Sequence, residues 1–438
     1  SIIAYLFRSA KKFFLCPDPF WGIMEKNWDT GERKMVIGII GGGASGMAAA
    51  LAAASVPGTE VVLMERQARL GRKLRATGNG RCNLTNLYAG ERGYHGNREG
   101  FWEEALRRFS PEETLGWFRE MGLFTAAEPS GRVYPYSDQA NSVADILRFA
   151  LDQPHISRKL GFAAEKVRVL PSGFRVESRE DAVSCDRLIV ACGGLAGTGL
   201  GGSMSGYQLL RSLGHRCTRL RPNLVQLRSD WGALPSLKGV RANCRVSVLH
   251  DGTEFAGSRG EIQFTEYGLS GPVIFEVSRD VCQGVGSWVC RLDFLPETEE
   301  EVLERELLRR KATELPASEL FTGILHNRLG RVLTAESGIG QAGAVREIPD
   351  AALRLAARTA KQLDVTLKEP MGMDAAQVTA GGICTEEFDE KTMESKLVPG
   401  LYACGEVLDV DGDCGGYNLQ WAWSSGRLAG FSAGRKEP

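Results

Sequence analysis

A short glycine-rich run between an apolar segment and an alanine-rich segment is the strongest constraint that this sequence places on its fold. Residues 35–40 are almost entirely apolar, residues 41–46 read GGGASG, and residues 47–54 are rich in alanine. A second apolar segment, residues 59–65, ends on an acid. This order predicts a strand, a tight turn, a helix and a second strand within about 30 residues, as in the βαβ unit of dinucleotide-binding domains.

Each glycine of the predicted turn has a separate purpose. Gly41 allows the tight turn, Gly43 lets the backbone approach a pyrophosphate, and Gly46 lets the helix pack closely against the strand. The first N–H groups of the helix have no partner within it, and they lie at the positive end of its dipole. We therefore expect a pyrophosphate at this turn, with Glu65 accepting hydrogen bonds from ribose hydroxyls.

The composition restricts the class of protein. The chain has 438 residues, enough for more than one core, and a net charge of −1. Balanced charge predicts no general attraction to nucleic acid, and no apolar stretch has the length of a membrane span. The cysteines form no CxxC pair and the histidines have no metal-ligand spacing, so we expect neither disulfides nor a metal site. We expect a cytoplasmic protein that acts on a small molecule and does not insert stably into a membrane.

The end of the chain favours FAD over NAD as the cofactor. An apolar segment ends on Gly405 and Glu406, and the run 414–421, CGGYNLQW, begins a helix. A carboxylate at a strand end can accept hydrogen bonds from the ribityl chain of a flavin. The N–H groups at a glycine-rich helix start can face the flavin ring. A dinucleotide domain completed by the C-terminal strand and helix therefore predicts bound FAD.

We predict an α/β fold in which a Rossmann-like FAD-binding domain of the glutathione-reductase type is split by an inserted domain. Alternating apolar residues after about residue 216 predict antiparallel strands of a β-barrel, and residues 297–360 have helical spacing. The expected parts are a mobile N-terminal extension (1–34), the first part of the FAD-binding domain (35–215), the β-barrel and helical insert (216–372) and the second part of the FAD-binding domain (373–438). Within the first part, residues 66–86 are expected to form a long loop and residues 100–122 to be helical.

Further short motifs lie outside the first βαβ unit. They are Gly71-Arg72-Lys73, 77–86 (TGNGRCNLTN), 264–272 (FTEYGLSGP), 379–383 (TAGGI) and 415–420 (GGYNLQ). Together with the run 41–46 they resemble the flavoprotein family that includes aminoacetone oxidase and the BaiN-type 3-dehydro-bile-acid reductases. The resemblance extends from about residue 35 to residue 432. One departure is visible in residues 198–206, TGLGGSMSG, where the family's acid near Ser205 is missing.

The resemblance implies FAD in an extended conformation and a set of contacts to it. The glycines and Ser45 would meet the pyrophosphate, and Arg72 and Lys73 the phosphate region. Val167 would offer backbone groups to adenine, while the C-terminal residues would lie along the ribityl chain and the flavin. The residues predicted to bind the cofactor are Gly41, Gly43, Ala44, Ser45, Gly46, Glu65, Arg72, Lys73, Asn79, Asn83, Val167, Gly193, Gly405, Glu406, Asn418 and Leu419.

These features predict an FAD-dependent oxidoreductase. The resemblance favours a reductase that takes electrons from NADH or NADPH and reduces an activated C=C bond in a steroid-like or bile-acid-like enone, by hydride transfer through flavin N5. Because the sequence has one dinucleotide fingerprint, a nicotinamide donor would have to reach the flavin directly. No motif identifies a catalytic residue, as expected where the cofactor carries the chemistry. Two alternatives remain: an aminoacetone-type amine oxidase that uses oxygen, and a non-catalytic flavin-binding redox module.

Overall fold

A parallel sheet carries the glycine-rich turn at the end of its central strand. In the computed structural model, residues 33–90, 92–281, 286–340 and 343–435 are described. The sheet consists, in spatial order, of β20 (Leu401–Ala403), β11 (Arg187–Val190), β1 (Met35–Ile40), β2 (Thr59–Glu65) and β7 (Ile156–Leu160). All of its neighbouring strands run parallel. Ile37 and Ile39 of β1 are fully buried, as expected for a parallel strand covered on both faces.

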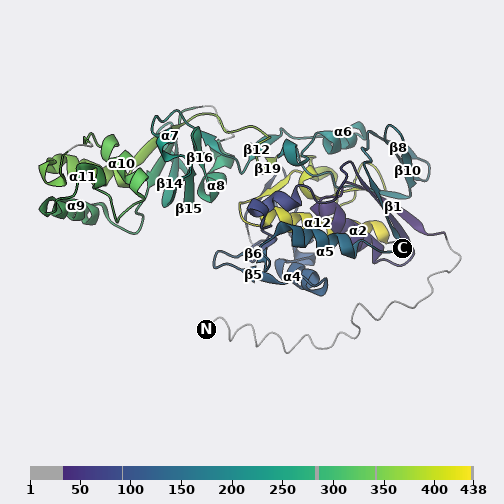
Figure 1. Cartoon of the computed structure of the whole chain (residues 1–438). Helices are drawn as coiled ribbons and strands as arrows, with labels where there is room; N and C mark the ends of the chain where they lie inside the picture. Colours follow the sequence, from purple (N-terminus) through teal and green to yellow (C-terminus); the bar gives the residue numbers. More distant parts are fainter. Residues whose placement is uncertain (1–32, 91, 282–285, 341–342, 436–438) are drawn as a thin grey trace. The chain divides into compact units, whose positions relative to one another are not determined.

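The C-terminal helix completes the domain that the first helix begins. Helix α2 (Ala44–Ala54) follows the glycine-rich turn, and α12 (Tyr417–Gly434) lies beside it (Figure 1). A Cβ atom on Gly426 would lie 2.4 Å from the carbonyl oxygen of Ser45, and one on Gly430 would lie 2.3 Å from that of Ala49. Small residues one turn apart therefore let the two helices approach closely. With β20 in the parallel sheet, this packing confirms the predicted split Rossmann-like fold.

The structure refines two predicted segments. Residues 100–122 are helical as predicted, and they form two helices, α3 (Glu103–Arg108) and α4 (Pro111–Glu120). The break lies at Ser110, whose hydroxyl accepts a hydrogen bond from the N–H of Glu113 and so caps α4. The loop 66–86 is not wholly irregular, because it contains the 3-10 helix η2 (Leu74–Gly80) and the short strand β3 (Thr85–Asn86).

A second, antiparallel sheet has a hydrophobic core of its own. Its strands, in spatial order, are β13 (Leu227–Arg228), β16 (Gly268–Ser270), β15 (Thr253–Phe264), β14 (Arg241–His250), β17 (Trp288–Asp293) and β18 (Leu363–Leu367). The N–H of Lys368, just after β18, donates to the carbonyl oxygen of Arg228 at 2.8 Å. This contact brings the two outer strands of the sheet together, so the sheet approaches a closed barrel, as predicted.

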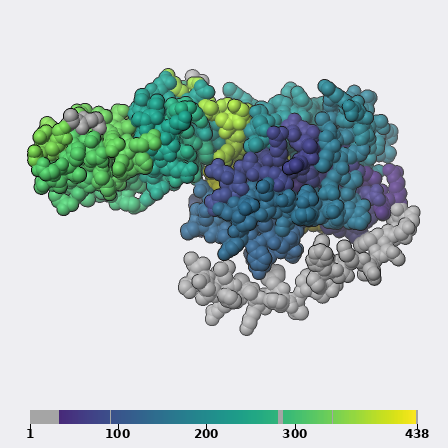
Figure 2. Space-filling model, viewed as in Figure 1, coloured from purple at the N-terminus to yellow at the C-terminus, as the bar shows by residue number. Residues whose placement is uncertain are grey.

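Helices accompany this second sheet. They are α8 (Pro272–Val281), α9 (Glu300–Arg309), α10 (Asn327–Glu336) and α11 (Asp350–Lys361). The chain before the sheet, β12 (Arg221–Asn223), pairs with the chain after it, β19 (Val378–Ala380). In Figure 2 the residues that include α9, α10 and α11 are coloured green and form one continuous region of the surface. The limits 216 and 372 remain predictions, and the predicted N-terminal extension lies outside the described residues apart from Arg33 and Lys34.

Candidate cofactor site

A cavity of about 970 Å³ lies at the carboxyl ends of β1 and β2. Its volume is at the upper end of the range of small-molecule and cofactor sites. Segments far apart in the chain line it, including the glycine-rich turn, the loop after β2, the start of α12 and residues of the second sheet and α8. In an open parallel α/β sheet this is the expected position of a ligand.

The glycine-rich turn has the geometry that a pyrophosphate site requires. Gly41 has a φ of 111°, and a Cβ atom there would lie 2.3 Å from the carbonyl oxygen of Ala191. At Gly46 a Cβ atom would lie 1.8 Å from the carbonyl oxygen of Gly41. A Cβ atom on Gly43 would meet nothing within 4 Å, and this residue lines the cavity. Gly41 and Gly46 are therefore needed for packing, whereas Gly43 leaves space for a ligand.

Glu65 is held at the end of β2 by backbone donors. Its Oε2 accepts a hydrogen bond from the N–H of Gly42 at 2.7 Å, and its Oε1 accepts one from the N–H of Gln67 at 2.7 Å. The carboxylate thus ties the glycine-rich turn to the following loop. A carboxylate has more lone pairs than these two donors use, so it can still accept from hydroxyl groups.

The basic loop after β2 reaches the C-terminal part of the chain. Lys73 Nζ lies 2.9 Å from Glu406 Oε2, and Glu406 Oε1 accepts from the N–H of Thr379 at 2.8 Å. Arg72 donates to Gln67 Oε1 at 3.0 Å. These contacts gather positive and negative groups at one wall of the cavity.

Unusual backbone conformations occur further along the same loop. Asn79 and Cys82 have φ values of 55° and 62°, in the left-handed region that non-glycine residues rarely adopt. Asn83 lines the cavity, and its buried Oδ1 has no hydrogen-bond partner among the described residues. A buried polar atom without a partner is costly, so a ligand donor at this position fits the site.

The loop before α12 is shaped by its glycines and by Asn418. Gly416 has a φ of 103° and precedes the first residue of the helix. The side-chain amide of Asn418 donates to the carbonyl oxygen of Gly412 at 2.7 Å, and its Oδ1 accepts from the N–H of Gly412 at 2.8 Å. The side chain of Asn418 thereby holds in place the loop that precedes α12, the helix to which Asn418 belongs.

Most of the predicted cofactor-binding residues line this one cavity. They are Gly41, Gly43, Ala44, Ser45, Glu65, Arg72, Lys73, Asn79, Asn83, Gly193, Glu406, Asn418 and Leu419. Gly46, Val167 and Gly405 are not in its lining. The side chain of Val167 is buried in the core, whereas residues 162–165, just before its strand β8 (Lys166–Leu170), do line the cavity. The contacts themselves remain predictions.

Several lining residues were not predicted from the sequence. They are Arg132 of β6 (Arg132–Pro135), Leu224, Gln226, Gln263 and Phe275. In the structure burial alternates along β6: Val133 and Pro135 are buried, while Arg132 and Tyr134 are not. Gln263 belongs to β15 and Phe275 to α8, whereas Leu224 and Gln226 lie between β12 and β13. Local patterns do not place these segments beside a nucleotide site.

The cysteines near the cavity are unreactive. Burial raises the pKa of Cys82 to about 12 and that of Cys414 to about 11, so both remain thiols at neutral pH. Among the described residues there is no group of three or more His, Cys, Asp or Glu side chains that could hold a metal ion.

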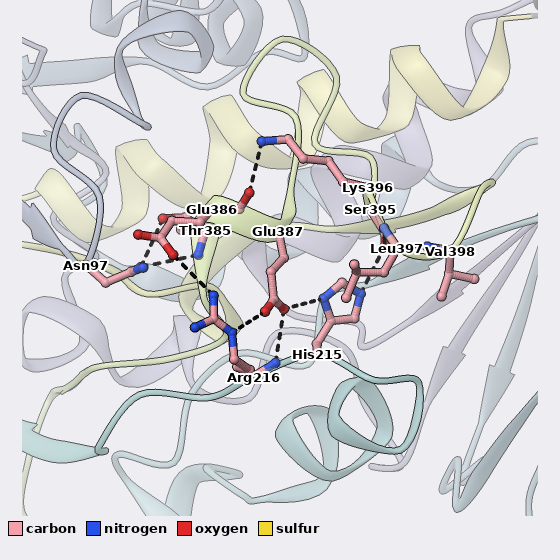
Figure 3. A network of polar contacts seen from close by, with 10 residues as sticks. All are labelled: Asn97, His215, Arg216, Thr385, Glu386, Glu387, Ser395, Lys396, Leu397 and Val398. Carbon is pink, nitrogen blue, oxygen red and sulfur yellow. Dashed lines mark hydrogen bonds and ion pairs between the residues drawn. The ribbon is translucent and has the colours of Figure 1, made fainter.

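A separate polar network has the order serine, histidine, acid (Figure 3). His215 Nδ1 lies 2.9 Å from Glu387 Oε2, and its Nε2 lies 3.0 Å from Ser395 Oγ. Both His215 and Ser395 are buried, and neither lines the cavity. Ser395 Oγ also accepts from the N–H groups of Leu397 and Val398. The network thus stabilises a chain segment and is not placed to attack a substrate.

The fold and the cavity define a dinucleotide-binding flavoprotein of the split Rossmann type. The model of the HI0933-like protein Rossmann domain matches residues 35–432. The chain therefore belongs to the HI0933-like family and is an FAD-dependent oxidoreductase. Within the described residues, no helix combines the length and the apolar character that crossing a bilayer requires.

Curated relatives match nearly the full chain. The chain is 40% identical to the 3-dehydro-bile acid delta(4,6)-reductase of Clostridium scindens, over 91% of this chain and 99% of the relative. It is 32% identical to the ribosomal RNA dihydrouridine synthase of Escherichia coli, over 88% of this chain and 95% of that protein. It is 29% identical to the synthase of the same name from Haemophilus influenzae, over 91% of this chain and 98% of that protein. The suspected family resemblance is thereby confirmed.

Proposed function

We propose that this chain reduces an activated C=C bond in a steroid-like enone, using FAD and taking electrons from NADH or NADPH. The observation that carries the proposal is the 40% identity to a bile acid reductase over 99% of that relative's length. The proposed substrate is therefore a planar, largely apolar molecule in which the double bond is conjugated to a carbonyl group.

The described residues fit FAD in the cavity. We propose that the turn at Gly43 and the first N–H groups of α2 bind the pyrophosphate, with Glu65 on the adenosine ribose and Lys73 on the phosphate region. The open space at Gly43 and the unpaired Oδ1 of Asn83 support this placement. When bound there, FAD supplies the capacity to accept and donate a hydride.

The protein's own contribution is binding, orientation and exclusion of water. We propose that Leu224, Pro272 and Phe275, which line the cavity from the chain around the second sheet, form an apolar wall for the substrate. An apolar wall displaces water and so strengthens the polar interactions made inside the cavity. On this proposal residues 216–372 act as a substrate domain, and residues 35–215 and 373–438 hold the cofactor.

Anaerobic reduction of the purified yellow protein tests the electron donor. Mixing with NADH or NADPH in a stopped-flow instrument should bleach the flavin absorbance, and adding a 3-oxo-4,6-diene steroid should restore it with formation of the reduced steroid. Absence of fast bleaching with either nucleotide would contradict the reductase. Reoxidation by oxygen after reduction with an amine would instead support the oxidase alternative, and no turnover of any kind would support a redox module.

The rRNA dihydrouridine synthases provide the second candidate function, because the chain covers 95% of the Escherichia coli protein at 32% identity. Both reactions saturate a C=C bond next to a carbonyl group. Against this candidate, the net charge of −1 supplies no general attraction to RNA. Incubating the reduced protein with ribosomal RNA and with the steroid in parallel, followed by mass spectrometry of both products, separates the two functions.

A further inference from the structure

Strand β6 places two polar side chains in the cavity. Its residues alternate in burial, with Val133 and Pro135 turned into the protein and Arg132 and Tyr134 lining the cavity. The guanidinium carbon of Arg81 lies 4.0 Å from the centre of the Tyr134 ring. Tyr134 is therefore held by stacking, whereas the position of Arg132 depends on other contacts.

Arg132 lies against the loop that begins α12. Gly415 has a φ of 120°, and a Cβ atom there would lie 2.9 Å from Arg132 Nε, so the side chain of Arg132 packs closely against this loop. The side chain of Asn86, which pairs with Arg132 across β3 and β6, donates to the carbonyl oxygen of Gly415 at 2.9 Å. Arg132 is thus fixed beside the N-terminal end of an 18-residue helix.

The guanidinium of Arg132 retains its hydrogen-bonding capacity. Its acidic partner is Glu276 of α8, with 3.9 Å between Arg132 Nη2 and Glu276 Oε1. That distance is longer than a hydrogen bond, and within the described parts of the chain the guanidinium donates no hydrogen bond. The side chain is 23% exposed. A largely buried cation with unused donors, in the lining of a cavity, is arranged to bind an oxygen atom of a ligand.

The apolar residues of α8 near Arg132 indicate what kind of ligand carries that oxygen. Pro272 and Phe275 of α8 line the cavity; Phe275 directly precedes Glu276, and Pro272 lies about one turn before it. An apolar ligand lying against these side chains would have its polar end near Arg132.

We propose that Arg132 binds the carbonyl oxygen of the substrate, the one conjugated to the C=C bond that is reduced. This inference rests on the proposed function. A charged donor at this oxygen favours the negative charge that develops on it when the β-carbon receives a hydride.

Equilibrium dialysis of the oxidised, FAD-loaded protein measures this contact without turnover. Two ligands are compared: a 4-en-3-one steroid and the same steroid without its 3-oxo group. In the Arg132→Met variant the dissociation constant of the ketone should rise about tenfold or more, as expected for loss of a hydrogen bond to a charged donor. That of the deoxy steroid should change less than twofold, and the FAD content should equal that of the wild type.

Two further variants serve as controls. Arg132→Lys keeps the charge but loses the planar set of donors, and should recover part of the affinity for the ketone. Arg168→Met removes an exposed arginine that pairs with Glu177, away from the cavity, and should bind both steroids as the wild type does. If Arg132→Met does not fold, Arg132→Lys still tests the proposal, because it should weaken binding of the ketone more than binding of the deoxy steroid.

The outcomes test the role of Arg132 separately from the proposed steroid reductase function. Equal weakening of both steroids, or loss of FAD from Arg132→Met and Arg132→Lys, would overturn the role of Arg132 in binding the carbonyl. Ketone binding that is unchanged in Arg132→Met would overturn it too, while leaving the proposed function intact. If the wild type binds neither steroid but binds a uridine oligonucleotide with dependence on Arg132, the carbonyl contact holds and the steroid substrate is wrong. Binding of neither ligand class overturns both.

Discussion

Lys73 and Glu406 form an ion pair 2.9 Å long, although 333 residues separate them in the chain. The sequence predicts a separate contact with FAD for each of them. In the structure they join the loop after β2 to the segment after β20. The side chains are 30% and 20% exposed, so the pair is only partly screened by water. The two halves of the split domain are thus connected at the cavity itself.

The Lys73–Glu406 pair should stabilise the fold as well as the site. Lys73→Met, Glu406→Gln and the double variant form a double-mutant cycle, measured by urea unfolding of the FAD-free protein. We expect a coupling energy of about 0.5–1 kcal/mol, the size typical of a partly exposed pair. A coupling energy of zero would mean that the contact contributes nothing without the cofactor.

Two glycines that lie three residues apart should respond differently to the same substitution. Gly46→Ala places a Cβ atom 1.8 Å from the carbonyl oxygen of Gly41, and should destabilise the protein by about 1–3 kcal/mol as other overpacked sites do. The Cβ atom added by Gly43→Ala would have no atom within 4 Å, so the unfolding free energy of this variant should stay near that of the wild type. The variant should bind FAD about tenfold more weakly. Urea unfolding and FAD titration measure the two effects. Normal FAD affinity in Gly43→Ala would show that the pyrophosphate lies elsewhere.

The buried histidine should make the protein less stable in mild acid. Burial lowers the pKa of His215 more than its hydrogen bond to Glu387 raises it. As the pH falls through the ordinary histidine pKa of about 6.5, the unfolded chain therefore takes up a proton before the native chain does. The unfolding free energy should fall between pH 7 and pH 5. The decline should be smaller in His215→Gln and unchanged in His326→Asn, which alters an exposed histidine that caps α10.

The buried ion pair between Arg279 and Asp411 should affect stability with a pH dependence opposite to that of His215. Arg279 of α8 pairs with Asp411 of β21 (Val410–Gly412), and burial raises the pKa of Asp411 to about 6 although Arg279 lowers it. Arg279→Met leaves a buried carboxylate without its cation, which should cost about 3 kcal/mol at pH 8. The native state regains stability as the pH falls and Asp411 is protonated, so the loss should be smaller at pH 5. Equal losses at both pH values would contradict this account, and Asp411→Asn should remove the difference.

The sequence by itself determined the cofactor-binding framework. The turn at Gly41, Gly43 and Gly46 is a local pattern, since strand, turn and helix follow one another within one βαβ unit, and its role can be inferred from the conformations that only glycine adopts. The C-terminal motif around Glu406 was also recognisable, because a strand end followed by a glycine-rich helix start is local too. These segments lie where the sequence predicts them.

Which side chains from distant segments line the cavity could be seen only in the folded protein. Arg132 comes from the short strand β6 and Phe275 from α8, and they line one cavity because segments far apart in the chain pack together. Long-range contacts of this kind depend on burial and shape rather than on local periodicity. Lys73 and Glu406 show the same limit, because each residue was recognisable but their pairing was not.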